Sequence, residues 1–109
     1  MAKYEKTVNG DFYKILAKIE NGILNSSISA SLEESSDFRS GDARCSVRVF
    51  ERYSYFGSNR VSLSVTVFQN GEEPVRISAI TSGGSQAVFF KLNTVGEEAF
   101  LDKLKDVLA

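Results

Sequence analysis

The strictest pattern in the chain is an alternation of apolar and hydroxyl-bearing side chains between residues 61 and 67. The apolar positions are Val61, Leu63, Val65 and Val67, and the positions between them are Ser62, Ser64 and Thr66. Because successive side chains of a strand point to opposite faces, this segment predicts a strand with one apolar and one polar face. Antiparallel sheets commonly pack such an apolar face on a core and leave the other face open.

A period of two recurs in Leu24–Leu32, Cys45–Val49 and Val75–Ala79, which we expect to be strands of the same sheet. Lys3–Val8 is expected to be a short first strand, and Gln86–Leu92 a last strand that is apolar on both faces. Within Cys45–Val49, the residues Cys45, Val47 and Val49 are expected to face the core. We expect a polar loop from Glu33 to Asp42.

Two short segments are expected to connect neighbouring strands as hairpins. One is Tyr55–Arg60, and the other is Asn70-Gly71, whose residue types accept positive φ at both central positions of a tight turn. Both turns favour antiparallel pairing of the strands that they join.

Two segments have the period of a helix. The first has an apolar stripe formed by Phe12, Ile15, Leu16 and Ile19. Asn9 is the expected N-cap of this helix, Asp11 suits its first turn, and Asn21-Gly22 is its expected end. The stripe predicts a helix with one face on the core.

The second helix is expected to begin at Thr94, since Thr94 and Glu97 have the spacing of a capping box. Its apolar side is formed by Phe100, Leu101, Leu104, Val107 and Leu108. These residues occupy one side of the helix, as expected of a helix that lies on the surface of a core.

The order of these elements predicts an α+β fold. We expect a single antiparallel sheet of five to six strands with two helices on one face, in the order β-α-β(4-5)-α, because both helices and the sheet then share one core. This order is TATA-binding-protein-like or helix-grip-like, an analogy that carries no function. The length of 109 residues predicts one domain, 1–109.

Composition excludes several kinds of chemistry. The chain has no His and one Cys, which rules out a Ser-His-Asp triad, a Cys-His pair and a structural zinc site within one chain. We expect no metal and no cofactor. A net charge of −1 gives no support for nucleic-acid binding. There is no apolar run long enough for a membrane span and no signal core, so we expect a cytoplasmic protein.

The second face of the expected sheet is rich in hydroxyl groups. We place on it Ser29, Ser31, Ser46, Arg48, Ser62, Ser64, Thr66, Arg76 and Ser78. It could simply face solvent, with Ser and Thr paired across strands. It could also be covered by a second copy in a homodimer, because small residues allow close approach, or it could be a flat platform for a polymer or peptide.

The segment Thr81–Ser85 is the candidate ligand site. Backbone N–H groups near glycines can converge on an anion, so we single out Ser82, Gly83, Gly84 and Ser85, with Arg48 and Arg76 as nearby cations. The segment has no Gly-Lys-Ser/Thr end and no G-x-G-x-x-G pattern. It could equally be a glycine turn between two strands. No residue is a catalytic candidate.

Three other features have structural explanations. Residues 50–60 interleave aromatic residues with arginines, a composition that can bind single strands but that strands also favour. Cys45 occupies an apolar position and is expected to be a small buried residue. The acidic residues within 33–42 fit no EF-hand spacing and are expected to be solvated.

Residues 51–63 and 78–91 resemble a family of small bacterial proteins that is labelled only as a domain of unknown function. The resemblance covers nearly the whole chain and is most specific in the second segment, from Ser78 to Lys91. It implies a small cytoplasmic bacterial protein and transfers no catalytic or binding residue.

These observations favour a non-enzymatic binding or interaction module, which could be homodimeric through the Ser/Thr-rich face. One alternative is a small-molecule or anion-binding protein of helix-grip type that uses Thr81–Ser85. A second alternative is an enzyme that acts on an anionic substrate without His.

Overall fold

The computed structural model describes residues 1–53, 60–83 and 90–109, and only the backbone of residues 90–95. Along the chain the elements are β1 (Ala2–Val8), α1 (Phe12–Leu24), β2 (Ser31–Ser40), β3 (Ala43–Tyr53), β4 (Arg60–Asn70), β5 (Val75–Gly83) and α2 (Phe90–Leu108). The order of strands in the sheet is β1-β5-β4-β3-β2, and all neighbours are antiparallel.

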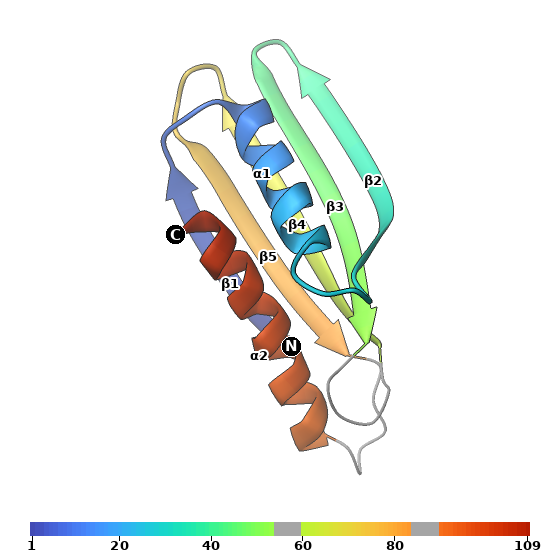
Figure 1. Ribbon diagram of the computed structural model, residues 1–109. Coiled ribbons are helices and arrows are strands. Elements are labelled where there is room, and N and C mark those ends of the chain that lie inside the picture. The colour runs from blue at the N-terminus through green and yellow to red at the C-terminus, as the bar shows by residue number, and fades with distance from the viewer. Residues whose placement is uncertain (54–59, 84–89) are drawn as a thin grey trace.

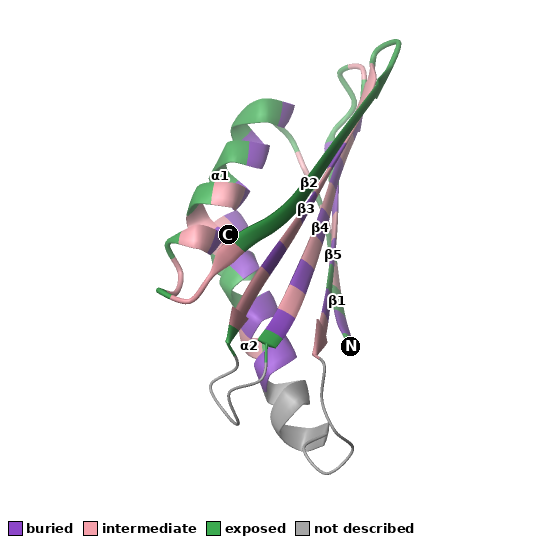
Figure 2. Cartoon of the chain, turned by 90° about the vertical axis from the view of Figure 1, so that its right-hand side faces the viewer, coloured by how far each residue is buried: buried purple, intermediate pink, exposed green. Residues whose placement is uncertain are grey.

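Both helices lie on one face of this five-stranded sheet, so the predicted α+β class is confirmed (Figure 1). The core lies between the helices and the strands β4 and β5, and Figure 2 shows the buried positions along these helices and strands. Its fully buried members include Ile19, Leu63, Val65 and Leu104. The apolar alternation of β4 was therefore predicted with the correct phase.

Strand β2 corrects the prediction for residues 24–42. The expected strand Leu24–Leu32 is wrong, since α1 continues to Leu24 and β2 begins only at Ser31. The expected polar loop Glu33–Asp42 is instead most of β2. Nearly all of β2 is exposed, because it is an edge strand that the helices leave uncovered. A strand that is exposed to solvent on both faces need not alternate apolar and polar residues. Its sequence therefore resembles that of a polar loop.

Strand β3 corrects a second prediction, the phase of its alternation. Arg48 pairs with Val65 and Ser46 pairs with Val67, so Ser46 and Arg48 lie on the helix side of the sheet. Cys45, Val47 and Val49, which were expected in the core, lie on the opposite face. Phe50 is fully buried and has the same parity as Ser46 and Arg48, so burying this large ring fixes the phase.

Helix α1 begins and ends at different residues from those predicted. Its N-cap is Asp11, not Asn9, and the Asp11 carboxylate accepts a hydrogen bond from the Lys14 N–H at 3.0 Å. The helix also continues past Gly22 to Leu24. A Cβ built on Gly22 would lie 2.4 Å from Val107 Cγ2, so this glycine permits close approach of α2 and does not end the helix.

Helix α2 begins at Phe90, which overturns its predicted start at Thr94 and the strand assignment of residues 90–92. Residues 86–89, the rest of the expected strand Gln86–Leu92, lie outside the described residues, as does most of the expected Tyr55–Arg60 hairpin. Glu97 is buried and its Oε1 atom lies 3.0 Å from the Met1 amine, so it forms an ion pair.

The strand predicted for residues 86–92 rested on a short apolar run without alternation. Such a run does not distinguish a strand from a helix.

Candidate functional site

The sheet surface opposite the helices is the candidate functional site, and we call it the open face. The strand registers place on it Lys3, Glu5 and Thr7 of β1, Arg76, Ser78, Ile80 and Ser82 of β5, Ser62, Ser64, Thr66 and Phe68 of β4, Cys45, Val47, Val49 and Glu51 of β3, and Ser31, Glu34, Ser36 and Phe38 of β2. No helix of the described chain covers this surface (Figure 2).

The hydroxyl-rich character predicted for this face is confirmed along its centre. Ser62, Ser64 and Thr66 of β4 all lie there, and Ser78 lies beside them on β5. Two predicted members, Ser46 and Arg48, lie on the helix side instead. A third, Ser29, precedes β2 in the connection from α1.

The open face is more apolar than the sequence suggested, because the apolar residues of β3 lie on it. Cys45, Val47 and Val49 are half-buried there and adjoin Phe68 of β4. Phe38 of β2 is the register partner of Cys45, whereas Ser64 separates Ile80 of β5 from Val49. Phe38 and Ile80 are 66% and 44% exposed. We call these six residues the apolar band.

Ion pairs and hydrogen bonds border the apolar band. Arg60 Nη2 lies 2.7 Å from Glu51 Oε1 and 3.4 Å from Glu33 Oε2. Ser62 Oγ donates to Glu51 at 3.1 Å, and Ser78 Oγ donates to Glu5 at 3.4 Å. These contacts hold the charged side chains at the margins of the face.

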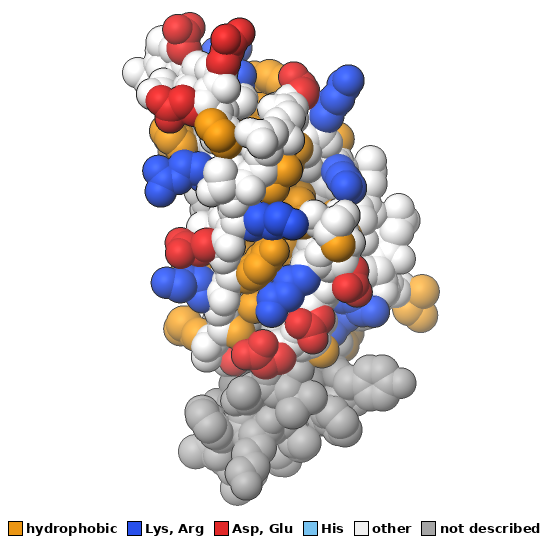
Figure 3. Space-filling model, turned by 90° about the vertical axis from the view of Figure 1, so that its left-hand side faces the viewer, with side chains coloured by type: hydrophobic (Ala, Val, Ile, Leu, Met, Phe, Trp, Pro, Cys, Tyr) orange, Lys and Arg blue, Asp and Glu red, His pale blue; other side chains and the backbone are white. Residues whose placement is uncertain are grey.

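A shallow hollow of about 470 Å³ lies at the β1–β5–β4 part of the open face. It is lined by Glu5, Thr7, Thr66, Phe68, Arg76 and Ser78, among others. Charges of both signs also alternate over the β1 side of the molecule, without a field of one sign (Figure 3). The β1–β5 part of the open face itself carries Lys3, Glu5 and Arg76, so it can meet a surface that is also mixed in charge.

The predicted ligand residues are not gathered in one place. Ser82 and Gly83 are the last residues of β5 and pair with Ser62 and Val61 of β4. Gly84 and Ser85 lie outside the described residues, so the anion site at Thr81–Ser85 stays a prediction. Arg76 is on the open face, whereas Arg48 is on the helix side, so these two arginines do not form a common patch.

Arg48 belongs to a row of three arginines that sequence reasoning missed as a group. Arg44, Arg48 and Arg52 are spaced by four along β3, have the parity of Phe50 and therefore share its helix-facing side. The equal spacing and the shared parity with Phe50 were the available signals. We call this set the arginine row.

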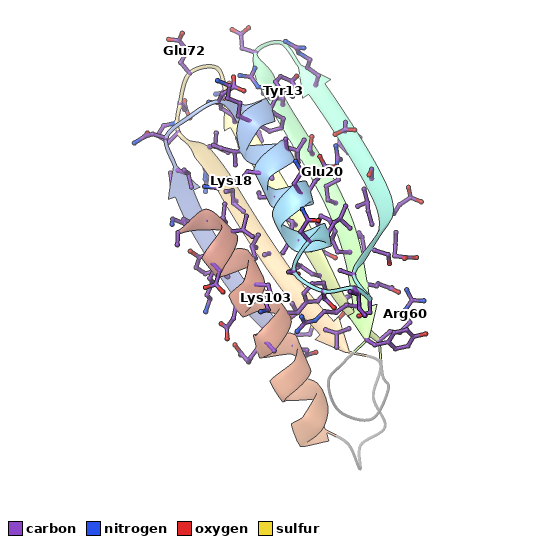
Figure 4. All side chains as sticks on the ribbon, in the orientation of Figure 1. Tyr13, Lys18, Glu20, Arg60, Glu72 and Lys103 are labelled. Atoms are coloured by element: carbon purple, nitrogen blue, oxygen red, sulfur yellow. The ribbon has the colours of Figure 1, made fainter. Side chains whose placement is uncertain are left out.

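The middle arginine is held by two carboxylates. Arg48 Nε lies 3.2 Å from Glu20 Oε2, and Arg48 Nη1 lies 3.0 Å from Asp37 Oδ1. Figure 4 shows Glu20 on the side of α1 that is nearer β3. Ser46 Oγ donates to Asp37 at 2.6 Å, and the hydrogen bonds from Ser46 and Arg48 hold the pKa of Asp37 below its usual range. A carboxylate with a lowered pKa is a weak base, which suits an ion pair better than proton transfer.

The last arginine of the row lies against an aromatic ring. The Arg52 guanidinium carbon is 4.7 Å from the ring centre of Phe100 in α2, and burial lowers the pKa of Arg52. Among the described residues its Nε makes no hydrogen bond. Cation–π contact of this kind stabilises a partly desolvated guanidinium.

The described residues contain no group of three or more His, Cys, Asp or Glu side chains placed to hold a metal ion. None of the described helices is long and apolar enough to cross a membrane. The geometry of the open face offers apolar and hydroxyl contacts, which suit binding.

Comparison with known proteins gives one match. The family described as "Family of unknown function (DUF6054)" matches residues 1–109. No curated protein and no solved structure matches the chain significantly.

Proposed function

We propose that this chain, which belongs to the DUF6054 family of unknown function, is a non-enzymatic interaction module that forms a homodimer through its open face. The observation that carries the proposal is the apolar band on a sheet surface without helix cover. Partly exposed apolar side chains grouped on one face are costly in water and often mark a contact site. A second copy is the occupant that the size and the charges of the face favour.

The size of the open face supports a stable dimer. The sheet is five strands wide, or about 24 Å at the usual strand spacing. Its strands have 7 to 11 residues, which gives a mean length of about 32 Å at the usual rise per residue. The resulting area of roughly 760 Å² is close to the roughly 800 Å² that each partner buries in a standard interface.

The arrangement of residues across the face supports pairing with an identical copy. One row crosses all five strands and contains Lys3, Ile80, Ser64, Val49 and Glu34 in that spatial order. A twofold axis parallel to β4 would place Lys3 opposite Glu34 of the partner subunit and Ile80 opposite Val49 of the partner subunit. Both contacts would occur twice, as a twofold interface requires.

The same axis would bring the two β4 strands together at the centre. Their outward side chains there are Ser62, Ser64 and Thr66, which are short enough to let the sheets approach. Face-to-face sheets normally pack about 10 Å apart with strands within about 30° of each other. Small hydroxyl residues on the central strand β4, with apolar residues on the neighbouring strands, are compatible with this distance between the two sheets.

The first test is Ile80→Glu, examined by sedimentation velocity over a wide concentration range. The new carboxylate would lie beside Lys3 within the subunit but against an apolar surface in the dimer, so we expect the dissociation constant to rise about 30-fold or more. Ile28→Glu is the matched control, because Ile28 is fully exposed in the connection between α1 and β2. A monomeric wild-type chain at all concentrations would refute the proposal.

The second test is a charge exchange. Lys3→Glu and Glu34→Lys should each weaken the dimer several-fold, since exposed ion pairs contribute below about 1 kcal/mol each. The double variant restores both opposite-charge contacts and should return the dissociation constant toward that of the wild type. Additive loss in the double variant would show that these two residues do not meet across the interface.

A further inference from the structure

Two arginines stand directly opposite each other near the β2–β3 hairpin, on the helix side of the sheet. Arg39 of β2 is the register partner of Arg44 of β3. Side chains that are directly opposite in an antiparallel pair have Cβ atoms roughly 5 Å apart, and like charges in that position destabilise the sheet. Such a pair needs a compensating negative charge.

The first turn of α1 and strand β4 hold Arg44 in place. Its guanidinium carbon lies 5.5 Å from the ring centre of Phe12 and 5.8 Å from that of Tyr13. Its Nη2 donates to Gln69 Oε1 at 2.8 Å. Arg44 is thus a fixed positive charge, whereas Arg39 is exposed and free to adjust.

The neighbouring carboxylates are not paired with these two arginines. Asp37 is bound by Ser46 and by Arg48. Asp42 offers Arg44 only its backbone carbonyl, 3.5 Å from Nη1. Within the described residues, neither Arg39 nor Arg44 takes part in an ion pair.

A pocket of about 180 Å³ lies at this pair. Its lining includes Arg39, Arg44, Tyr13, Asp37 and Ser46. It adjoins the first turn of α1, whose N-terminal N–H groups are already capped by the Asp11 carboxylate, so the two arginines supply the positive charge of the pocket. Figure 4 shows Tyr13 at that end of α1.

We propose that this pocket binds a phosphate group, which bridges Arg39 and Arg44. A guanidinium presents planar, forked N–H donors that match phosphate oxygens, and two of them compensate the charge of one phosphate. Asp37 also lines the pocket, but its carboxylate is already paired with Arg48 and Ser46. The aromatic ring of Tyr13, another lining residue, can contact an organic group esterified to the phosphate. This site is on the opposite side of the sheet from the open face and is independent of dimer formation.

The test is a titration of ¹⁵N-labelled full-length protein with inorganic phosphate at constant ionic strength, followed by the arginine side-chain signals in NMR spectra. We expect saturable shifts at Arg39 and Arg44. Arg39→Gln should raise the dissociation constant about 10-fold or more, since a charge-assisted contact is lost. Lys103→Gln is the matched control, because it removes one exposed positive charge on α2 that belongs neither to the pocket nor to the open face.

Unfolding measurements separate binding from folding. Arg39→Gln without phosphate should unfold at the same temperature as the wild type or higher, since it relieves the like-charge pair. Phosphate should raise the unfolding temperature of the wild type and of Lys103→Gln but not of Arg39→Gln. A parallel titration with phenyl phosphate distinguishes a phosphate ester from free phosphate, and Tyr13→Ala should abolish any preference for the ester.

Three outcomes would overturn the proposal. One is the absence of saturable shifts in the wild type with both probes. Another is equal weakening by Arg39→Gln and Lys103→Gln, which would indicate only diffuse surface attraction. The third is unchanged affinity in Arg39→Gln.

Discussion

Two regions of the helix-facing side of the sheet differ sharply although they are adjacent. On β4 and β5 this side is apolar and fully buried, as at Val65 and Val67. On the neighbouring strand β3, the residues paired with these two are Arg48 and Ser46. We call the first region the apolar half, and the helix-facing side of β2 and β3 the polar margin.

The difference shows how far the cover of two helices extends. α1 and α2 lie over the apolar half, whereas β2 remains uncovered at the edge (Figure 1). An arginine at the border can pack its aliphatic stem against the core and keep its head group near polar partners. Arg48 does so between Glu20 of α1 and Asp37 of β2.

The largest expected effect comes from truncating one leucine in each region. Leu63 of the apolar half and Leu32 of the polar margin both flank Phe50 on the helix-facing side, but they are 0% and 36% exposed. Leu63→Ala should lower the free energy of unfolding by about 2–5 kcal/mol, and Leu32→Ala by about 1 kcal/mol or less. Denaturant unfolding measures both values. Equal losses of unfolding free energy would mean that side-chain burial stabilises the two regions to the same extent.

A smaller effect is expected at the contact between the helices over the apolar half. Gly22→Ala places a Cβ against Val107, and overpacking of this kind costs about 1–3 kcal/mol. The gain in helix propensity, about 1 kcal/mol, offsets only part of this cost. Val107→Ala in the Gly22→Ala background should recover stability. A stabilised Gly22→Ala single variant would show that the contact relaxes freely.

The smallest expected effect is a dependence on pH in the polar margin. Hydrogen bonds from Ser46 and Arg48 depress the folded-state pKa of Asp37. Its contribution to stability is therefore present above the unfolded-state pKa, near 3.9, and is lost as the pH falls through the lower folded-state value. Ser46→Ala should lower stability at neutral pH by less than about 1 kcal/mol.

Urea unfolding at a series of pH values measures this effect. The difference between the wild type and Ser46→Ala should shrink below about pH 4. Ser35→Ala is the control, because Ser35 lies two residues from Asp37 on the same strand. A difference that is constant with pH would mean that the Ser46 contact does not depend on the charge of Asp37.

The sequence predicted the elements whose environment is uniform along their length. β4 alternates strictly because one face is core and the other is open. The expected hairpin follows it, but β4 includes Asn70 and the connection runs from Gly71, which has a positive φ, to Pro74. β2 could not be predicted because an exposed edge strand carries no pattern. The phase of β3 could not be predicted because apolar residues occupy both of its faces.

The candidate site was predicted only in its hydroxyl part. Ser62, Ser64 and Thr66 were placed on the open face from the phase of β4 alone. The apolar band was missed because the phase of β3 was reversed. The Arg39–Arg44 pair was missed because residues 33–42, which include Arg39, were predicted to be a loop and not a strand paired with β3.

The sequence by itself determined the α+β class, two amphipathic helices and the inner and outer sides of β4, since local periodicity follows directly from which face is buried. Only the tertiary structure decided which side of β3 faces the helices, where the sheet ends and which charges meet. Those outcomes depend on contacts between residues far apart in the sequence, such as the burial of Phe50 and the approach of α2 to Gly22. A local sequence pattern cannot predict such contacts.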